Sequence, residues 1–413
     1  MNKQYIIVAI ILVLLTVGLI GCIEDNILWE KTYDGIGGWD RAAAIAIDPS
    51  GNIYIAGYAT GLFGSTGRDW WIKKFDQNGN EDTANWNNIY GKPVQEDEVF
   101  SITTDASGNV YAVGYESDFV NPEQAWIKKF DQNGNEDTAN WNKTFGGNSL
   151  SDRFYSVALD SIGNIYVLGA RVLLVDQTGG ASSVKTVLWI KKLDPNGNED
   201  TTHWNKTYDS EYSFVPSSIA LDNNNNLYVT GYRVMSNNSI VGEILKFDSN
   251  NNLIWKRSYN WLMFEGNSFS VATDDYGNIY VGGYISIQGE SPTTDWWIKK
   301  FDSEGNEDTT NWNKTLDGNG GHDYIYSIAT DTDGNVYVAG NGVNLIGLTG
   351  MDWWIKKFDL QGNELWDKRY DGNGDYDVPY SVAVDSNGNV YVAGGGTSLK
   401  GSTQLDWWIK KLV

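Results

Sequence analysis

A ten-residue phrase that recurs seven times constrains this chain more than any other feature. Its last copy, DSNGNVYVAG, occupies residues 385–394. The tyrosine at its seventh position and the glycine at its tenth never vary among the copies. The other copies begin at Asp48, Asp105, Asp160, Asp222, Asp274 and Asp331, and successive copies lie 57, 55, 62, 52, 57 and 54 residues apart. A fixed period of this size is typical of repeat arrays and propellers.

Each repeat contains four segments with the pattern of short β-strands. Taken from the last two units, the four segments read YSVAVD, VYVAGG, DWWIKKFD and ELWDKRYDG, separated by turns rich in Gly, Asn and Asp. The VYVAG segment is apolar on both faces, as expected of a sheet packed between two others. No helical pattern follows residue 21. We therefore predict an all-β fold, a seven-bladed β-propeller with four antiparallel strands in each blade.

The two ends of the chain predict how the ring closes. The seventh unit stops after its third strand, DWWIKKL at residues 406–412, and lacks an outer strand. Residues 27–33 read ILWEKTY and match the outer strand ELWDKRY of the preceding unit. We expect this N-terminal strand to complete the last blade, which removes the exposed edges of an open array. Residues 27–413 then form a single domain.

Residues 1–21 have the pattern of an N-terminal targeting signal. Lys3 precedes an apolar run from residue 5 to residue 20, which is long enough for a signal-peptide core but short for a membrane span. The run ends in LIGC, which resembles the lipobox of prokaryotic lipoproteins. This resemblance implies a signal peptide over 1–21, a lipid on Cys22, a short tether over 22–26 and an extracytoplasmic domain held at the membrane. The alternative is an uncleaved N-terminal anchor.

The unit WDKRYDGNGDYDVPYSVAVDSNGNVYVAGGGTS resembles the seven-bladed β-propeller repeat family of prokaryotic cell-surface proteins. The resemblance covers the whole mature chain and implies an extracellular fold, but it implies no reaction. One departure is the tryptophan pairs at 70–71, 296–297, 353–354 and 407–408. We expect these pairs in the core, covered by lysine stems, rather than on a ligand-stacking surface. Another departure is the insertion NEDTANW between the third and fourth strands of several units.

Charge limits the partners of the domain. Without residues 1–21 the chain has 29 basic and 53 acidic residues, a net charge of −24. A domain this acidic repels nucleic acids and anionic lipid surfaces, so we expect membrane contact only through the N-terminal lipid. The expected partner is a protein or a glycan at the cell surface, and the expected state is a monomer.

Catalytic side chains are scarce. His203 and His322 are the only histidines and Cys22 is the only cysteine, which excludes zinc sites built on His and Cys. Acid–base chemistry could come only from carboxylates, which glycosidases use in pairs. We therefore predict a non-catalytic binding module. The alternatives are a carboxylate-based glycan hydrolase or lyase, a quinone-dependent propeller enzyme, and a structural envelope component.

One set of aspartates predicts a metal site. Five units carry an aspartate four residues before the small residue of the innermost strand, and these are Asp40, Asp97, Asp152, Asp323 and Asp377. Carboxylates that ring one mouth of the channel could hold a cation, and calcium is the one cofactor we consider. The alternative is an aspartate that caps a repeated turn. The acidic loops at Asp76, Asp131 and Asp194 have glycine at the fourth position rather than the sixth, so we expect turns there.

The loops after the second strands vary in length and sequence, so we place recognition on the face that carries them. Candidate ligand residues on that face are Trp39, Phe63, Trp261 and Tyr376. Their aromatic and neighbouring carboxylate groups would suit a sugar or a peptide. Four sequons offer glycosylation sites, at Asn142, Asn205, Asn237 and Asn313.

Overall fold

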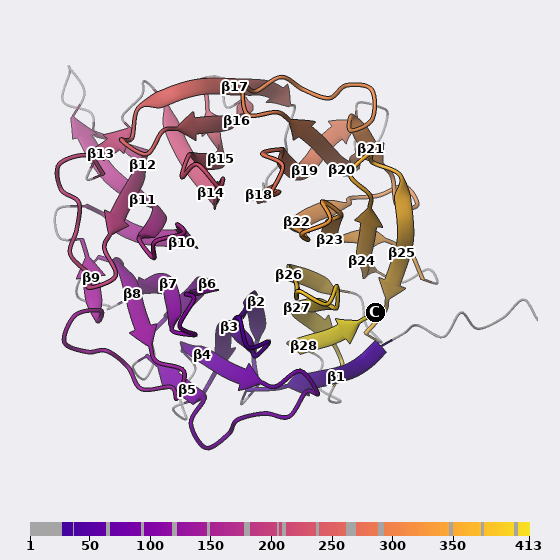
Figure 1. Ribbon diagram of the computed structural model, residues 1–413, viewed down its shortest axis with the longest axis horizontal. Coiled ribbons are helices and arrows are strands. Elements are labelled where there is room, and N and C mark those ends of the chain that lie inside the picture. The colour runs from indigo at the N-terminus through magenta and orange to yellow at the C-terminus, as the bar shows by residue number, and fades with distance from the viewer. Residues whose placement is uncertain are drawn as a thin grey trace, which may run out of the picture.

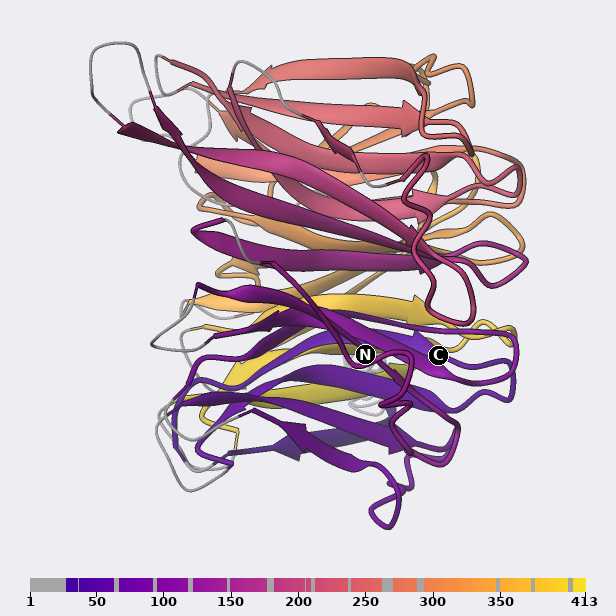
Figure 2. The ribbon, with the colours of Figure 1, turned by 90° about the vertical axis from the view of Figure 1, so that its left-hand side faces the viewer.

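Seven four-stranded sheets stand around a central axis and form a closed ring (Figure 1). The strands run between the two faces of the ring (Figure 2). The computed structural model describes residues 27–35, 37–62, 67–91, 95–117, 122–146, 149–176, 182–204, 206–208, 212–236, 239–261, 270–287, 293–346, 350–372, 376–399 and 404–413. This part of the chain contains strands and turns and no helix. The predicted all-β, seven-bladed propeller is confirmed.

Within each blade, neighbouring strands are antiparallel and follow chain order from the axis outward. Blade 1 holds β2 (Arg41–Ile47), β3 (Ile53–Thr60), β4 (Arg68–Phe75) and β5 (Asn87–Tyr90). Blade 2 holds β6 (Glu98–Thr104), β7 (Val110–Glu116), β8 (Gln124–Phe130) and β9 (Lys143–Phe145). Blade 3 holds β10 (Ser151–Leu159), β11 (Ile165–Asp176), β12 (Ser182–Leu193) and β13 (Lys206–Tyr208). Blade 4 holds β14 (Ser213–Leu221), β15 (Leu227–Val234), β16 (Ile240–Phe247) and β17 (Leu253–Trp261).

The remaining three blades repeat the arrangement. Blade 5 holds β18 (Ser270–Thr273), β19 (Ile279–Ile287), β20 (Thr293–Phe301) and β21 (Lys314–Leu316). Blade 6 holds β22 (Tyr324–Thr330), β23 (Val336–Val343), β24 (Met351–Phe358) and β25 (Glu364–Tyr370). Blade 7 holds β26 (Val378–Val384), β27 (Val390–Thr397), β28 (Leu405–Leu412) and, from the start of the chain, β1 (Ile27–Tyr33).

Strand β1 closes the ring as predicted. It pairs antiparallel with β28, with Tyr33 opposite Trp407 and Lys31 opposite Ile409. In Figure 1 the first and last strands lie side by side at the rim. The C-terminal strand therefore has a partner on both sides, and its backbone groups are not left as an open edge.

The invariant tyrosine of the repeat stabilises the preceding hairpin turn through a hydrogen bond. In blade 1, Asp48 accepts hydrogen bonds from the backbone N–H groups of Ser50 and Asn52, each at 2.9 Å. The buried hydroxyl of Tyr54 donates to the same carboxylate at 3.0 Å. The same tyrosine-to-aspartate bond occurs in all seven blades, at 2.9–3.3 Å. One carboxylate thus accepts hydrogen bonds from the backbone N–H groups of the turn and from the buried tyrosine hydroxyl. This shared role explains why the aspartate and the tyrosine recur together.

The invariant glycine is required by close packing on the first strand of its own blade and on the preceding blade. A Cβ atom on Gly57 would lie 1.8 Å from the carbonyl oxygen of Arg41 and 2.9 Å from the indole of Trp407. Equivalent contacts surround Gly394, where the indole belongs to Trp353 of the preceding blade. Any side chain at these positions would displace both the neighbouring strand and the tryptophan.

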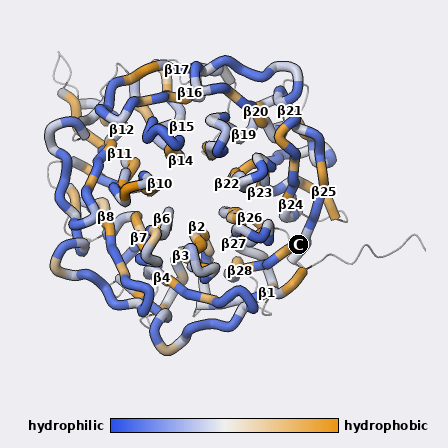
Figure 3. The backbone as a smooth tube through the Cα atoms, in the orientation of Figure 1, coloured by the Kyte–Doolittle hydropathy of each residue, from blue (hydrophilic) through white to orange (hydrophobic). Residues whose placement is uncertain are grey.

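The tryptophan pairs lie in the core between blades, as expected. The first tryptophan of each pair is fully buried and donates its indole N–H to a carbonyl of the next blade, as Trp407 does to Tyr58 at 2.9 Å. Its ring contacts a tryptophan of that blade, and the Trp353 and Trp408 centroids are 4.6 Å apart. Aromatic contacts of this kind each contribute about 0.5–1.5 kcal/mol beyond the area they bury. In Figure 3 hydrophobic colour is concentrated in strands and most of the rim is hydrophilic.

The insertion NEDTANW supplies a cover for the invariant tyrosine. In blade 1, the inserted Trp86 is fully buried and lies 4.9 Å from the Tyr54 ring. The inserted Glu81 pairs with the buried Lys73 of strand β4. Blade 4 lacks the insertion, and there Trp255 of the outer strand lies 6.0 Å from Tyr228. The insertion is therefore a second way to cover the same ring.

Candidate functional site

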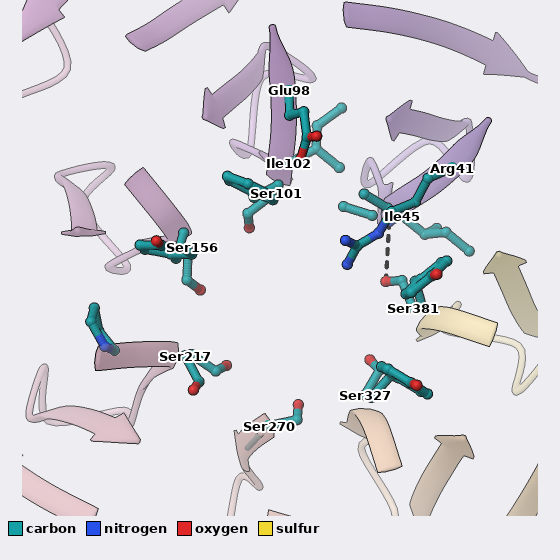
Figure 4. A pocket seen from close by; sticks show the side chains of 18 of the residues that line it. Arg41, Ile45, Glu98, Ser101, Ile102, Ser156, Ser217, Ser270, Ser327 and Ser381 are labelled. Carbon is teal, nitrogen blue, oxygen red and sulfur yellow. Dashed lines mark hydrogen bonds between the residues drawn. The ribbon is translucent and has the colours of Figure 1, made fainter. Parts of the chain in front are cut away.

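The first strand of every blade borders one central cavity of about 580 Å³. The first strands lie closest to the axis (Figure 1), and their side chains project into the space between them (Figure 4). The lining includes hydroxyl groups, aromatic rings, two arginines and one glutamate. This cavity is the candidate ligand site.

A ring of serines links the blades around the cavity. Ser381 of blade 7 accepts a hydrogen bond from the backbone N–H of Ile45 in blade 1 at 3.2 Å. Figure 4 shows this bond. The same bond joins four other pairs of blades, through Ser101, Ser156, Ser270 and Ser327 at 3.0–3.3 Å. These serines therefore have a structural role, and they also present polar atoms along the wall of the cavity.

Among the described residues, an aromatic side chain precedes the small residue of the first strand in four blades and covers part of the cavity wall. Phe100 stacks on Tyr155, with centroids 5.3 Å apart and planes inclined by 17°. Tyr326 and Tyr380 meet edge to face at 5.4 Å. Burial raises the pKa of Tyr326 and of Tyr380, so both hydroxyls stay protonated near neutral pH and can donate hydrogen bonds.

Three arginines lie on or beside the wall, and two of them are paired. Arg68 pairs with Glu98 and Glu96, and Arg153 binds Glu123 through two nitrogens. Arg41 instead lies over the ring of Tyr380, 3.9 Å from its centroid. Its side chain points into the cavity in Figure 4.

The five predicted metal aspartates are buried but do not line the cavity. Each lies at its own blade junction, and four of them directly precede a first strand, whereas Asp152 is the second residue of β10. Asp40 accepts the backbone N–H of Thr60 at 2.8 Å, and Asp377 accepts that of Thr397 at 2.8 Å. Asp97 and Asp323 make the same bond, and Asp152 binds Arg171 at 3.0 Å. The four backbone bonds join the start of a first strand to the end of the second strand, next to the variable loops, whereas Arg171 lies within β11.

Three of these aspartates stand in separate acidic clusters rather than in one ring. The clusters are Asp34, Asp40 and Asp406; Asp295, Asp317 and Asp323; and Asp352, Asp371 and Asp377. In each cluster, carboxylate oxygens of the three residues lie within 4.8 Å of one another. Burial and neighbouring carboxylates raise the pKa of Asp40 and of Asp377 to about 7, although backbone N–H groups favour the ionised form. Calcium binding at the five aspartates stays a prediction, and its geometry would be local to each junction.

The acidic loops at Asp76, Asp131 and Asp194 form turns. In the first, Asp76 accepts the backbone N–H groups of Asn78 and Asn80 at 2.9 and 2.8 Å. The other two loops repeat these bonds. Each of the three carboxylates thus serves the backbone of its own loop.

Two of the four predicted ligand-face aromatics meet near the cavity. Trp39 is 54% exposed, its ring lies 6.0 Å from that of Tyr376, and Tyr376 lines the cavity. Phe63 lies outside the described residues. For Trp261, only the backbone at the end of β17 is described.

Two of the four sequons can be located. Asn142 and Asn313 are exposed, and their side-chain oxygens accept bonds from Lys128 and Lys299 at 3.0 and 2.8 Å. Asn205, Asn237 and the lipidation site Cys22 lie outside the described residues. Glycosylation and lipidation therefore stay predictions.

Sequence reasoning missed the main residues of the cavity wall, namely Arg41, Glu98, Phe100, Tyr155, Tyr326 and Tyr380. A signal was present for the aromatic members, because four of them directly precede the small residue of the first strand. No comparable signal marks Arg41, whose position is held by Glu98, Arg153, Val215 or Tyr324 in other blades.

The ring, the four-stranded blades and the axial cavity define the chain as a closed seven-bladed β-propeller. A family described as "Beta-propeller repeat" matches residues 37–64, 316–344 and 368–398. These three stretches match the repeat, as the sequence resemblance predicts for them, and the signal peptide stays a prediction. No curated protein matches the sequence.

Solved structures share the fold at low identity. A polysaccharide lyase, an ulvan lyase, is 10% identical with a TM-score of 0.52, and the alignment covers 93% of this chain and 96% of the lyase. The same kind of lyase bound to -[GlcA(1-4)Rha3S]- is 11% identical with a TM-score of 0.51 and the same coverage. A protein of unknown function from Dyadobacter fermentans is 10% identical with a TM-score of 0.49, over 94% of this chain and 99% of that one.

The similarity to the two lyase structures shows the propeller fold alone. Within the described residues, no helix is long and apolar enough to cross a membrane.

Proposed function

We propose that this protein is a non-catalytic binding module that holds a glycan in its central cavity at the cell surface. The observation that carries the proposal is the composition of the cavity wall. Aromatic rings, hydroxyl groups and a guanidinium group face one space of about 580 Å³. Ligand sites commonly have volumes of roughly 300–1,000 Å³ and a few converging polar groups.

The wall suits the chemistry of a sugar. A sugar ring offers C–H groups on its faces, which pack on aromatic rings, and hydroxyls at its edges, which exchange hydrogen bonds. Phe100 and Tyr155 supply aromatic surface, and Tyr326 and Tyr380 supply phenol hydroxyls. Trp39 and Tyr376 extend this surface toward the face that carries the variable loops. A peptide remains the alternative ligand.

The scarcity of carboxylates among the described wall residues favours binding over hydrolysis. Most glycosidases need two carboxyl groups that flank the scissile bond. Among the described residues that line the cavity, Glu98 is the one carboxylate, and it is paired with Arg68. A hydrolase or lyase would have to draw its second catalytic group from another residue type. We therefore propose that the glycan leaves the cavity unchanged.

The site is proposed to lie outside the cytoplasm, with the propeller tethered through a lipid on Cys22. The support is the apolar run and the LIGC sequence at residues 19–22. About five residues separate Cys22 from β1, a reach of roughly 17 Å at full extension, so the ring would be held close to the membrane. Mass spectrometry of the mature protein should find lipid on an N-terminal Cys22. An unmodified chain that begins at Met1 would contradict the anchor.

A printed glycan array, followed by analysis of the bound glycans, tests the binding function. We expect the purified protein to retain a restricted group of glycans and mass spectrometry to recover them uncleaved. Shortened products would favour the enzyme alternative. An array without any bound glycan, under conditions in which the protein is folded, would contradict the proposal and favour a protein ligand or a structural role.

A further inference from the structure

We infer that Arg41 is an anion-recognition residue and that the glycan bound in the cavity carries a carboxylate, as in a uronic acid. This inference rests on the proposed function, because it names the chemical class of the ligand in the same cavity. It depends on the position of one guanidinium group, the absence of an ion-pair partner for it among the described residues, and the paired state of its neighbours.

The surroundings of Arg41 hold its guanidinium group without neutralising it. The side chain is half-buried at the start of β2, with its guanidinium carbon 3.9 Å from the Tyr380 centroid. Tyr376, Tyr326 and Tyr58 are close enough for the charge of Arg41 to act on their hydroxyls. Its Nε atom is buried and has no hydrogen-bond acceptor among the described residues. Stacking on an aromatic ring fixes the plane of a guanidinium and leaves its edge available for an acceptor.

The other two arginines at the cavity form ion pairs with glutamate side chains, as expected of a guanidinium group with a structural role. Arg68 has Glu98 and Glu96, and Arg153 has Glu123. No ion pair of Arg41 occurs in the described part of the chain, although 53 acidic residues stand in the sequence. A partly buried cation in so acidic a protein is expected to have a carboxylate partner unless an external anion takes that place.

The geometry of the group indicates the class of anion. Arginine presents parallel N–H donors that match the two oxygens of a carboxylate. The free edge faces a cavity whose remaining wall consists of aromatic rings and hydroxyls, which suit the rest of a sugar. A uronic acid combines these features, because one ring carries both the hydroxyls and the carboxylate.

The test compares oligouronates with their methyl esters, which differ in charge but keep the sugar rings. Isothermal titration uses tetragalacturonate and tetraglucuronate, each with its ester, against the wild-type protein, Arg41→Gln, Arg41→Lys and Arg369→Gln. Arg369 lies on outer strand β25, so Arg369→Gln makes the same change of charge outside the cavity. Thermal unfolding of each variant shows whether it is folded.

We expect at least one acid to bind, its ester to bind about tenfold or more weakly, and Arg41→Gln to lose a similar factor for the acid alone. Arg41→Lys should retain part of the affinity, because it keeps the charge without the paired donors. Arg369→Gln should bind like the wild type.

Equal binding of acid and ester, or unchanged binding of the acid by a folded Arg41→Gln, would overturn the inference and leave the proposed function standing. Failure to bind either acid, when neutral glycans bind on the array, would also overturn the inference alone. Failure of every glycan on the array and in titration would overturn both.

Discussion

Asp40 and Asp377 are carboxyl groups whose ionisation is coupled to the fold. Each is fully buried, accepts two backbone N–H groups and belongs to a cluster with two other aspartates. Burial is the largest influence and raises both pKa values to about 7. The two carboxyl groups also hold the loops at their blade junctions through backbone hydrogen bonds. Their protonation should therefore affect the free energy of unfolding of the ring.

Stability should therefore fall as the pH rises from about 4 to about 7. The unfolded chain ionises these groups near pH 4, whereas the folded chain keeps its protons until about pH 7. The proton-linked stability is full below the unfolded pKa and is lost as the pH passes through the folded pKa. Each group contributes at most about 4 kcal/mol. Urea unfolding in EDTA at pH 4.5 and pH 7.5 measures the difference, which Asp40→Asn should reduce.

Asp76→Asn is the matched control for this measurement. Asp76 is little buried, and its hydrogen bonds, chiefly from Asn80, hold its pKa below the ordinary value, so it does not titrate between pH 4.5 and pH 7.5. Identical pH dependence in Asp40→Asn and the wild type would contradict the assignment.

The metal prediction is tested by replacing EDTA with calcium at pH 7.5. Calcium that bound the five aspartates would raise the melting temperature, since a ligand that binds only the folded state stabilises it by about 2.7 kcal/mol at a hundredfold excess over Kd. Joint neutralisation of Asp40, Asp97, Asp152, Asp323 and Asp377 should abolish the shift. An unchanged melting temperature would leave these residues with their turn-organising role.

At the scale of strands, neighbouring blades are held together by a recurring unit of tryptophan and glycine. Trp353 of β24 inserts beside Gly394 of β27, donates to the carbonyl oxygen of Gly395 at 3.0 Å and packs on Trp408. The glycine lacks a side chain because the indole occupies that space. The serine bonds between first strands act nearer the axis. The junctions between blades 5 and 6, 6 and 7, and 7 and 1 have both the apolar and the polar connection.

Replacing Trp353 with phenylalanine should destabilise the protein by about 2–3 kcal/mol. The substitution leaves a cavity and removes the donor to a buried carbonyl group. Guanidinium unfolding measures the change. Leu365→Ala on the outer strand provides the control, because Leu365 is 51% exposed and its loss should cost less than about 0.5 kcal/mol. Equal effects of the two substitutions would contradict the role assigned to the tryptophan.

At the scale of the whole molecule, the sequence predicts what the repeats share and misses what they do not. Seven copies of one phrase define the blades, and the match between residues 27–33 and the preceding outer strand predicts how β1 closes the ring. The tyrosine and the aspartate of the phrase bond to each other within a blade, and the glycine packs against the first strand and an indole of the preceding blade, so their recurrence reflects a local cause. The cavity wall combines single residues from different blades, as with Arg41 of β2 and Tyr380 of β26. The curvature of the ring decides which of these side chains lie next to one another. A periodic sequence pattern does not predict these neighbours.

The aspartates before the first strands illustrate the same limit. Their repetition predicts a shared role, and the structure gives four of them a bond to the end of their own second strand, whereas Asp152 binds Arg171. Their grouping depends on side chains from other strands, such as Asp406 of β28 and Asp352 of β24. A ring of carboxylates around one mouth was the simplest expectation from sequence, whereas the described clusters lie at individual junctions.

The most direct test of the central claim is glycan binding by a protein whose cavity has been filled. Ser217 lines the cavity, and its hydroxyl has no hydrogen-bond partner among the described residues, so Ser217→Trp would place an indole in the ligand space. Ile162→Trp is the control, because Ile162 is 73% exposed in a turn away from the cavity. Isothermal titration with the glycan selected on the array should show binding by the wild type and Ile162→Trp and none by a folded Ser217→Trp. Undiminished binding by Ser217→Trp would show that the ligand site lies elsewhere and would contradict the account.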